Sequence, residues 1–302
     1  MKLVALMPVR NESWCLGLTL RVALEWCDEV IVLIHASSDD SGEIACAVAA
    51  ANGGRVTVVG DARPLWDEMK HRQALLELAR SFEVSATHIA IVDADEFLTP
   101  NILSDIRGHV FSLAPGMMLE LPGYNVRECT CGVPGHWQYH TNGVWGNRWF
   151  ATAFKDGPAL NWASGGDRFH HREPFGCGWN RWRPLRQGYG GVVHLWGASE
   201  RRLRAKHALY KITERLRWPH KTAAEIEHTY GPATDPNSTL ARQMNMNRPW
   251  TFNQLPATWL EPYAPYMQYL HVDAEPWQEA EVRLLLETHG REHFRGLDLL
   301  GY

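Results

Sequence analysis

Short apolar runs alternate with segments of helical periodicity through the first hundred residues, and this alternation constrains the fold more than any other feature. Four runs have the length of buried strands: 3–7, 30–34, 56–59 and 88–92. Three intervening segments repeat apolar residues at helical spacing: 16–27, 44–51 and 66–82. Strands that alternate with helices predict an α/β fold with a mainly parallel sheet and helices on both faces. Ligands bind such sheets beyond the carboxyl ends of the strands, so the residues that follow each strand are the first site candidates.

The pattern becomes irregular after about residue 100. Gly, Pro and aromatic residues dominate, and three further strands are expected at 117–121, 148–153 and 191–195. Ser199 has the character of an N-cap for an amphipathic helix that runs to about Leu216. We therefore expect one large domain over 1–220, with halves 1–100 and 101–220, followed by a helical and loop extension over 221–302.

The composition is that of a folded protein without a membrane span. The chain has 302 residues, 45% of them apolar, and includes 14 tryptophans, which excludes a disordered chain. No apolar run approaches the roughly 18 residues of a spanning helix, and the first residues do not form a signal peptide. The six cysteines are scattered, so reduced thiols, a cytoplasmic location and no membrane partner are the expectation.

Charge is distributed unevenly along the chain. Residues 1–100 contain 8 Lys and Arg against 15 Asp and Glu, whereas residues 168–221 contain 13 against 3. The basic segment is interleaved with aromatic residues, a combination suited to phosphates and unpaired bases. A solvated helix face together with a few residues that serve a phosphate group is the alternative.

An Asp-x-Asp sequence follows the fourth predicted strand. Asp93 and Asp95 alternate where this strand ends, so both carboxylates can turn toward one hard cation, Mn²⁺ or Mg²⁺, which in turn neutralises a diphosphate. On these residues alone, a solvated turn between strand and loop is an equally good interpretation.

Four stretches in the first hundred residues resemble the family 2 glycosyltransferases. In chain order they are Leu6-Met7-Pro8-Val9-Arg10-Asn11-Glu12, Ser37-Ser38-Asp39-Asp40-Ser41-Gly42, Trp66-Asp67-Glu68-Met69-Lys70-His71-Arg72-Gln73-Ala74 and Val92-Asp93-Ala94-Asp95-Glu96-Phe97. The resemblance implies a GT-A fold, which is Rossmann-like, and an enzyme that transfers a sugar from a nucleotide diphosphate sugar to a hydroxyl acceptor. Residues 1–100 would then bind the nucleotide sugar, and 101–220 would bind the acceptor and close the metal site.

The same resemblance assigns roles to individual residues. The donor would contact Pro8, Arg10, Glu12, Asp40, Arg72 and Asp93. Asp93 and Asp95 would hold the metal, with His194 at the end of a late strand as third ligand, unless His194 is an ordinary core histidine. The chain departs from the family at His35, which stands where relatives place an acid that contacts the nucleoside, so the base of the donor is left open.

Two further groups of residues are candidates for chemistry. Asp167 is the best local candidate for a catalytic base, although a loop aspartate that caps a turn is the commoner case. Cys129, Cys131, His136 and His140 have residue types that a structural Zn²⁺ accepts, but the cysteine pair is closer than usual.

The acceptor is a glycan or small molecule in the first hypothesis. A second hypothesis is an enzyme that glycosylates hydroxymethylated DNA bases, as some phage enzymes do. Its contacts would come from the basic segment: Trp179, Arg181, Trp182, Arg183, Arg201 and Arg204. A third hypothesis, a binding module without catalysis, gives no reason for the Asp-x-Asp.

Overall fold

The structure divides the chain into two units. It is a computed structural model that describes residues 1–63, 66–82, 86–128, 136–163, 171–178, 180–244, 246 and 248–302. Unit 1 comprises 1–123, 149–193 and 256–271, and unit 2 comprises 124–148, 194–255 and 272–302. The chain passes between the units several times, so this division differs from the contiguous one that we predicted at residue 220.

A parallel sheet forms the centre of unit 1. Its strands are β1 (Leu3–Val9), β2 (Glu29–His35), β3 (Val56–Asp61) and β4 (His88–Ile91). They pair in parallel in the spatial order β3-β2-β1-β4. The predicted α/β fold with a mainly parallel sheet is thereby confirmed, and all four carboxyl ends lie at one edge.

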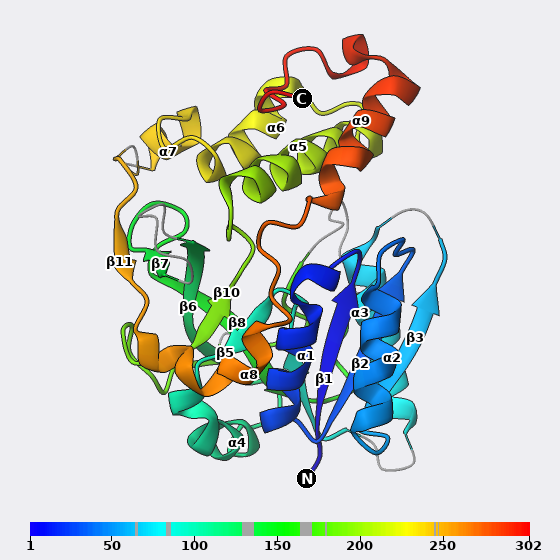
Figure 1. The fold of residues 1–302 in the computed structure, drawn as a ribbon, viewed down its shortest axis with the longest axis vertical. Helices are drawn as coiled ribbons and strands as arrows, with labels where there is room; N and C mark the ends of the chain where they lie inside the picture. The colour runs from blue at the N-terminus through cyan, green and yellow to red at the C-terminus, as the bar shows by residue number, and fades with distance from the viewer. Residues whose placement is uncertain are drawn as a thin grey trace. The chain divides into compact units, whose positions relative to one another are not determined.

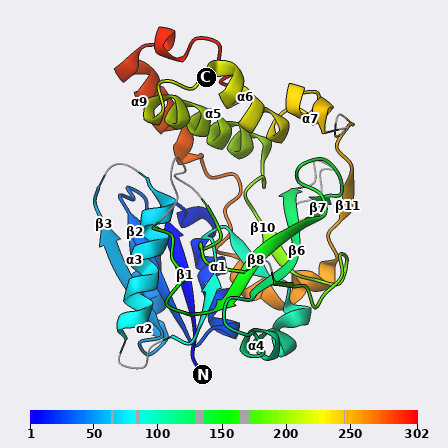
Figure 2. The same ribbon diagram turned by 180° about the vertical axis from the view of Figure 1, so that it is seen from behind.

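Helices cover both faces of this sheet, as predicted. Alternate residues of β1 pack into two separate cores, since Leu3, Ala5 and Met7 belong to one and Val4 and Leu6 to the other. The first core contains residues of α1 (Ser13–Trp26), α2 (Ser41–Ala51) and α4 (Leu103–Phe111), and the second contains α3 (Glu68–Ser81). Figure 1 shows α1 and α2 in front of the sheet, and Figure 2 shows α3 on the opposite face.

Short elements complete unit 1. They are β5 (Glu96–Leu98), η1 (Pro100–Ile102), β9 (Arg181–Trp182), η3 (Ala257–Trp259), η4 (Glu261–Tyr263) and α8 (Ala264–Met267). The longer β8 (Arg148–Lys155) pairs antiparallel with β4, close to the predicted strand at 148–153. Two strands begin in unit 1 and end in unit 2, β6 (Met118–Glu128) and β10 (Val192–His194).

Unit 2 consists mainly of helices. They are α5 (Glu200–Arg217), α6 (Ala223–Tyr230), η2 (Gly231–Ala233), α7 (Thr239–Gln243), α9 (Trp277–His289) and η5 (Arg291–Phe294), beside the strands β7 (Trp137–His140) and β11 (Phe252–Gln254). Ser199 caps α5 by accepting from the Arg202 amide at 3.2 Å, so the predicted helix is confirmed. In α5 and α9, Leu209, Ile212 and Val282 share one apolar cluster. Within the described residues, no helix combines the length and apolarity that crossing a membrane requires.

Candidate active site

The loops that follow β1 and β2 are hydrogen-bonded to each other. The Ser38 amide donates to Asn11 Oδ1 at 2.7 Å, and the Glu12 amide donates to Ser41 Oγ at 2.9 Å. Asn11 has a φ of 51°, in the left-handed region that asparagine tolerates better than most residues. These bonds fix two of the predicted donor segments against each other at the carboxyl edge of the sheet.

The predicted donor residues in these loops differ in exposure. Pro8 is buried in β1, Arg10 is half-buried and Asp40 is exposed directly before α2. Glu12 is buried, and its carboxylate accepts a hydrogen bond from Trp14 Nε1 at 2.5 Å. We therefore expect the Glu12 side chain to shape the loop, whereas Arg10 and Asp40 are more accessible to a ligand.

The Asp-x-Asp sequence forms the turn between β4 and β5. The carbonyl of Ala94, between the two aspartates, accepts a hydrogen bond from Thr19 Oγ1 of α1 at 2.6 Å. Asp93 is half-buried, while Asp95 is only 5% exposed. The turn is thus anchored to α1 through its backbone, and both carboxylates lie within the protein surface rather than on a solvated loop.

Asp93 lies between two guanidinium groups. Its Oδ1 is 2.5 Å from Arg72 Nη2, and its Oδ2 is 2.8 Å from Arg172 Nη1. Arg72 also pairs with Glu68 at 2.8 Å, and Arg172 donates to both carboxylate oxygens of Glu96 at 2.7 Å. Two cations therefore share three carboxylates at the end of β4, a charge-assisted network with defined geometry.

Burial perturbs one acid of this network. Burial raises the pKa of Glu96 to about 7, against the opposing effect of the Arg172 guanidinium. The guanidinium of Arg172 is further held by the backbone, since its Nε donates to the Ala151 carbonyl at 2.7 Å and its Nη2 to the Ile91 carbonyl at 3.2 Å. Arg172 thus joins β4, β8 and the Asp-x-Asp turn.

Arg172 is a site residue that the sequence did not single out. Its only signal was membership of the basic segment 168–221, where it is one cation of 13. It lies in a loop, so no strand or helix periodicity indicates which direction its side chain takes.

His194, the predicted third metal ligand, lies at the end of β10. Its Nδ1 is 2.7 Å from Asn125 Oδ1 of β6, and its ring stacks on Trp196 at a centroid separation of 6.1 Å. The hydrogen bond fixes the orientation of the ring, and such a bond is found both for histidines that bind metals and for histidines in a core. The ligand role of His194 stays a prediction.

Several predicted residues lie outside the described part of the chain: Asp167, Trp179, Cys129 and Cys131. Of the other predicted zinc ligands, His136 is exposed, whereas His140 is buried in β7 with its ring 4.6 Å from that of Phe252. The catalytic base and the zinc cluster are therefore not tested by the structure.

Cations of the basic segment pair extensively with acids elsewhere in the chain. In unit 1, Glu120 of β6 pairs with Arg183 at 2.6 Å and with Arg181 at 3.6 Å. Arg181 also pairs with Glu173 of the same segment at 2.5 Å, and Arg183 covers the ring of Trp149. Trp182 is half-buried against the first core.

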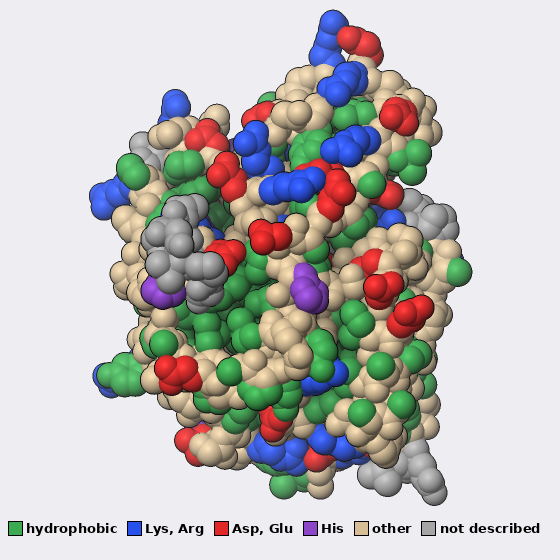
Figure 3. Space-filling view, viewed as in Figure 1, with side chains coloured by type: hydrophobic (Ala, Val, Ile, Leu, Met, Phe, Trp, Pro, Cys, Tyr) green, Lys and Arg blue, Asp and Glu red, His purple; other side chains and the backbone are tan. Residues whose placement is uncertain are grey.

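The same holds in unit 2. Arg201 pairs with Glu279 at 2.7 Å, and Arg204 donates to the carbonyl of Leu300 at 2.7 Å. The face of unit 2 visible in Figure 3 carries basic and acidic side chains next to one another over α5 and α9. The charge excess of the segment in sequence is thus substantially neutralised by partners from other segments.

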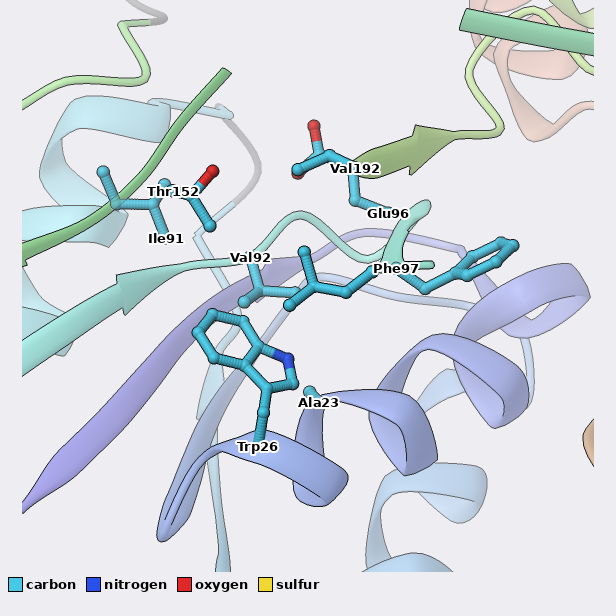
Figure 4. A pocket seen from close by; sticks show the side chains of 9 residues that line it. Ala23, Trp26, Ile91, Val92, Glu96, Phe97, Thr152 and Val192 are labelled. Carbon is cyan, nitrogen blue, oxygen red and sulfur yellow. The ribbon is translucent and has the colours of Figure 1, made fainter. Parts of the chain in front are cut away.

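A small cavity lies beside Glu96 in unit 1. It measures about 10 Å³ and is lined by Trp26, Val92, Phe97 and Thr152 among others, as Figure 4 shows. This volume is about that of one water-sized probe. The cavity is therefore too small to receive a sugar and is not a donor pocket.

No protein-family model and no curated protein matches the chain. Among solved structures it is similar to residues 1–349 of TarS from S. aureus in complex with UDP-GlcNAc, with 12% identity and a TM-score of 0.42 over 98% of this chain and 93% of that chain. It is also similar to the mannosyltransferase PcManGT from Pyrobaculum calidifontis in complex with GDP-Man and Mn²⁺, with 14% identity and a TM-score of 0.41 over 94% of this chain and 87% of that one.

A third similar structure covers less of the chain. It is glucosyl-3-phosphoglycerate synthase from Mycobacterium tuberculosis in complex with Mn²⁺, UDP and phosphoglyceric acid, with 18% identity and a TM-score of 0.29 over 41% of this chain and 43% of that one. Similarity at these levels carries no conclusion about activity, so the assignment of function depends on the residues themselves.

Proposed function

We propose that this chain is a metal-dependent glycosyltransferase that moves a sugar from a nucleotide diphosphate sugar to a hydroxyl group of a glycan or small molecule. The observation that carries the proposal is the position of Asp93, at the carboxyl end of β4 and between the guanidinium groups of Arg72 and Arg172. Carboxylates and cations at this edge of a parallel sheet are suited to a bound metal and a diphosphate.

The residues present fit Mn²⁺ or Mg²⁺. Asp93 and Asp95 offer hard oxygen ligands, and the side chain of Asp93 is 29% exposed. A cation at Asp93 must displace or share the contacts that Arg72 and Arg172 make to its two oxygens. We propose that Asp93 and Asp95 hold the cation. When bound, a divalent cation supplies positive charge that offsets the charge of the departing nucleotide diphosphate.

The chain's own residues would bind and orient the donor. The Arg72 side chain is 1% exposed, guanidinium included, and it is held by Glu68 and Asp93, so its guanidinium has a fixed direction. We propose that Arg72 faces the donor phosphates and that Pro8, Arg10, Glu12 and Asp40 line the nucleotide pocket. Asp167 is the proposed base that accepts the proton of the acceptor hydroxyl.

The ion pairs of the basic segment favour a glycan or small molecule over DNA as the acceptor. A surface that binds DNA must present cations to phosphates, whereas Arg181, Arg183 and Arg201 already pair with carboxylates of the same chain. Modified DNA is therefore included as an alternative acceptor in the experiment below rather than as the main proposal.

The experiment measures release of nucleotide diphosphate from a panel of nucleotide sugars, with Mn²⁺ or Mg²⁺ and with simple glycans or hydroxymethylated DNA as acceptors. Asp95→Asn should lower turnover at least about a hundredfold, because the lost charge stabilisation amounts to several kcal/mol. Asp105→Asn is the matched control, since Asp105 is an exposed residue of α4. Equal turnover by Asp95→Asn and the wild type, or full turnover in excess chelator, contradicts the proposal.

A further inference from the structure

A second group of metal-ligating side chains lies in unit 1, and none of its members belongs to the Asp-x-Asp sequence. The ligand atoms of His35, Asp61 and His71 all lie within 4.8 Å of one another. The sequence marked His35 only as a departure from the family pattern, and neither Asp61 nor His71 as a ligand. The three residues come from three different elements.

The register of the sheet brings two of them together. His35 is the last residue of β2 and Asp61 is the last of β3, and the two are direct partners in the parallel pairing. Paired residues of neighbouring strands direct their side chains to the same face of the sheet. Leu33 and Ile31, two and four positions before His35, pack in the core that contains α3, so this is the α3 face.

The third residue comes from the first turn of α3. His71 lies on the buried side of that helix, between Met69 and Leu75, and is 2% exposed. Its Nε2 is 3.6 Å from Asp61 Oδ2. This distance is too long for a hydrogen bond but close to the roughly 3.4 Å that separates two ligands on a tetrahedral Zn²⁺ with bonds of about 2.0–2.1 Å.

The imidazole nitrogens of the cluster are buried and unsatisfied. Both ring nitrogens of His35 and Nδ1 of His71 have no hydrogen-bond partner within the described residues, and His35 is 0% exposed. An unsatisfied buried polar group costs about 1–3 kcal/mol. These ring nitrogens are available to ligate a cation.

We propose that His35, Asp61 and His71 form a binding site for a borderline divalent cation such as Zn²⁺, separate from the Mn²⁺ or Mg²⁺ site at Asp93 and Asp95. Two imidazoles and one carboxylate are a donor set typical of Zn²⁺ and its neighbours in the first transition row, whereas Mg²⁺ takes oxygen ligands. Three protein ligands leave one tetrahedral position for water or for a group of a bound molecule. The ring of Trp66 closes one side, at 4.7 Å from the His71 ring and 5.3 Å from the His35 ring.

Arg63 competes with the cation for Asp61. Its Nη2 is 2.5 Å from Asp61 Oδ2 and its Nε is 2.9 Å from Oδ1, while the Arg63 side chain is 69% exposed. A guanidinium and a divalent cation repel each other at one carboxylate, and the exposed arginine can swing into solvent. Replacement of Arg63 should therefore strengthen metal binding rather than weaken it.

Calorimetric titration of the full chain with Zn²⁺ at about pH 7.5, together with the visible absorption of bound Co²⁺, tests the site. We expect one Zn²⁺ per chain at this cluster, affinity reduced by more than about 100-fold in His71→Ala, and tighter binding in Arg63→Gln. Should His71→Ala fail to fold, Asp61→Asn gives the same test. The titration measures metal binding directly, so its result is independent of any transferase activity.

Two controls separate this site from the others. Asp95→Asn must leave Zn²⁺ affinity unchanged, because its carboxylate belongs to the other proposed site. The double variant Cys129→Ser and Cys131→Ser must also leave Zn²⁺ affinity unchanged. It removes the cysteines of the zinc cluster predicted from the sequence, which are not ligands of the site proposed here. No Zn²⁺ binding by the wild type, or binding that survives Asp61→Asn but disappears in the cysteine variant, would overturn the proposal.

Discussion

At the scale of single residues, the most consequential feature is the ion pair between Arg172 and Glu96. The Glu96 side chain is 2% exposed. Its carboxylate accepts two hydrogen bonds from the Arg172 guanidinium, whose positive charge offsets the cost of burying a negative one. A buried pair of this kind contributes little compared with a well-packed apolar pair, but removal of one partner leaves an uncompensated buried charge. Arg172 is thus expected to be structural as well as close to the reacting groups.

Replacement of Arg172 by Met should lower the free energy of unfolding by about 3–5 kcal/mol. Without the guanidinium, the pKa of Glu96 rises further above about 7, so the folded state binds a proton that the unfolded state releases. The loss of unfolding free energy caused by Arg172→Met is therefore greater near pH 8 than near pH 5.5, because at the lower pH Glu96 is already protonated in the folded state of both proteins. Urea denaturation at both pH values measures it, and addition of Glu96→Gln should recover part of the stability. A loss below about 1 kcal/mol at both pH values would contradict this view of the pair.

At the scale of elements, the sequence predicted the helices and strands in which apolar residues repeat over many positions. The predictions of the parallel strands and of helix α5 were correct because each of these elements repeats apolar residues over many positions. The strands β5, β9 and β11 have two or three residues, too few for a period to appear. Tertiary pairing alone defines them.

The same limit applies to the sites. Asp93 and Asp95 are neighbours in sequence, so a local pattern predicted them. Proximity of His35, Asp61 and His71 depends on the register of β2 and β3 and on the face that α3 covers. No local pattern contains that information.

Strand β7 gives a prediction about pH. Burial, followed by the nearby Arg127, lowers the pKa of His140 to about 4, so this histidine is neutral in the folded state. The unfolded state binds a proton below about pH 6.5, so the stabilisation is complete above that pH and is lost as the pH falls toward 4. Between pH 7 and pH 5, His140 should account for a loss of about 2 kcal/mol.

Denaturant unfolding of the wild type and of His140→Gln at both pH values tests this contribution. The glutamine variant should lose about 2 kcal/mol less between pH 7 and pH 5. An equal pH dependence of the two proteins would show that His140 is protonated in the folded state, contrary to its burial among Trp250 and Phe252.

At the scale of the whole molecule, charge is balanced between segments that are distant in sequence. Arg172 pairs with Asp93, Arg183 with Glu120, and Arg201 with Glu279, each within its own unit. The net charge of −4 is the difference between 30 Lys and Arg and 34 Asp and Glu, and the ion pairs determine where these charges are neutralised locally. The basic segment contributes to the internal structure of both units.

We therefore expect weak DNA binding with little dependence on salt. A protein that neutralises several phosphates loses affinity steeply as salt rises, with a log-log slope of about −0.9 per duplex contact. A gel-shift titration on plain and hydroxymethylated duplexes between 50 and 200 mM salt should show no retention at 50 mM. Strong retention that Arg201→Ala with Arg204→Ala abolishes would instead support a DNA acceptor.

The central claim is that Asp93 and Asp95 hold a divalent cation that binds the donor diphosphate. Calorimetric titration with nucleoside diphosphates, UDP and GDP first, in the presence and absence of Mn²⁺, tests it most directly. For the wild type we predict that Mn²⁺ strengthens binding of at least one nucleoside diphosphate more than tenfold, and that Asp95→Asn removes this gain while Asp105→Asn keeps it. Equal affinity with and without Mn²⁺ in the wild type, or an undiminished gain in Asp95→Asn, would contradict the account.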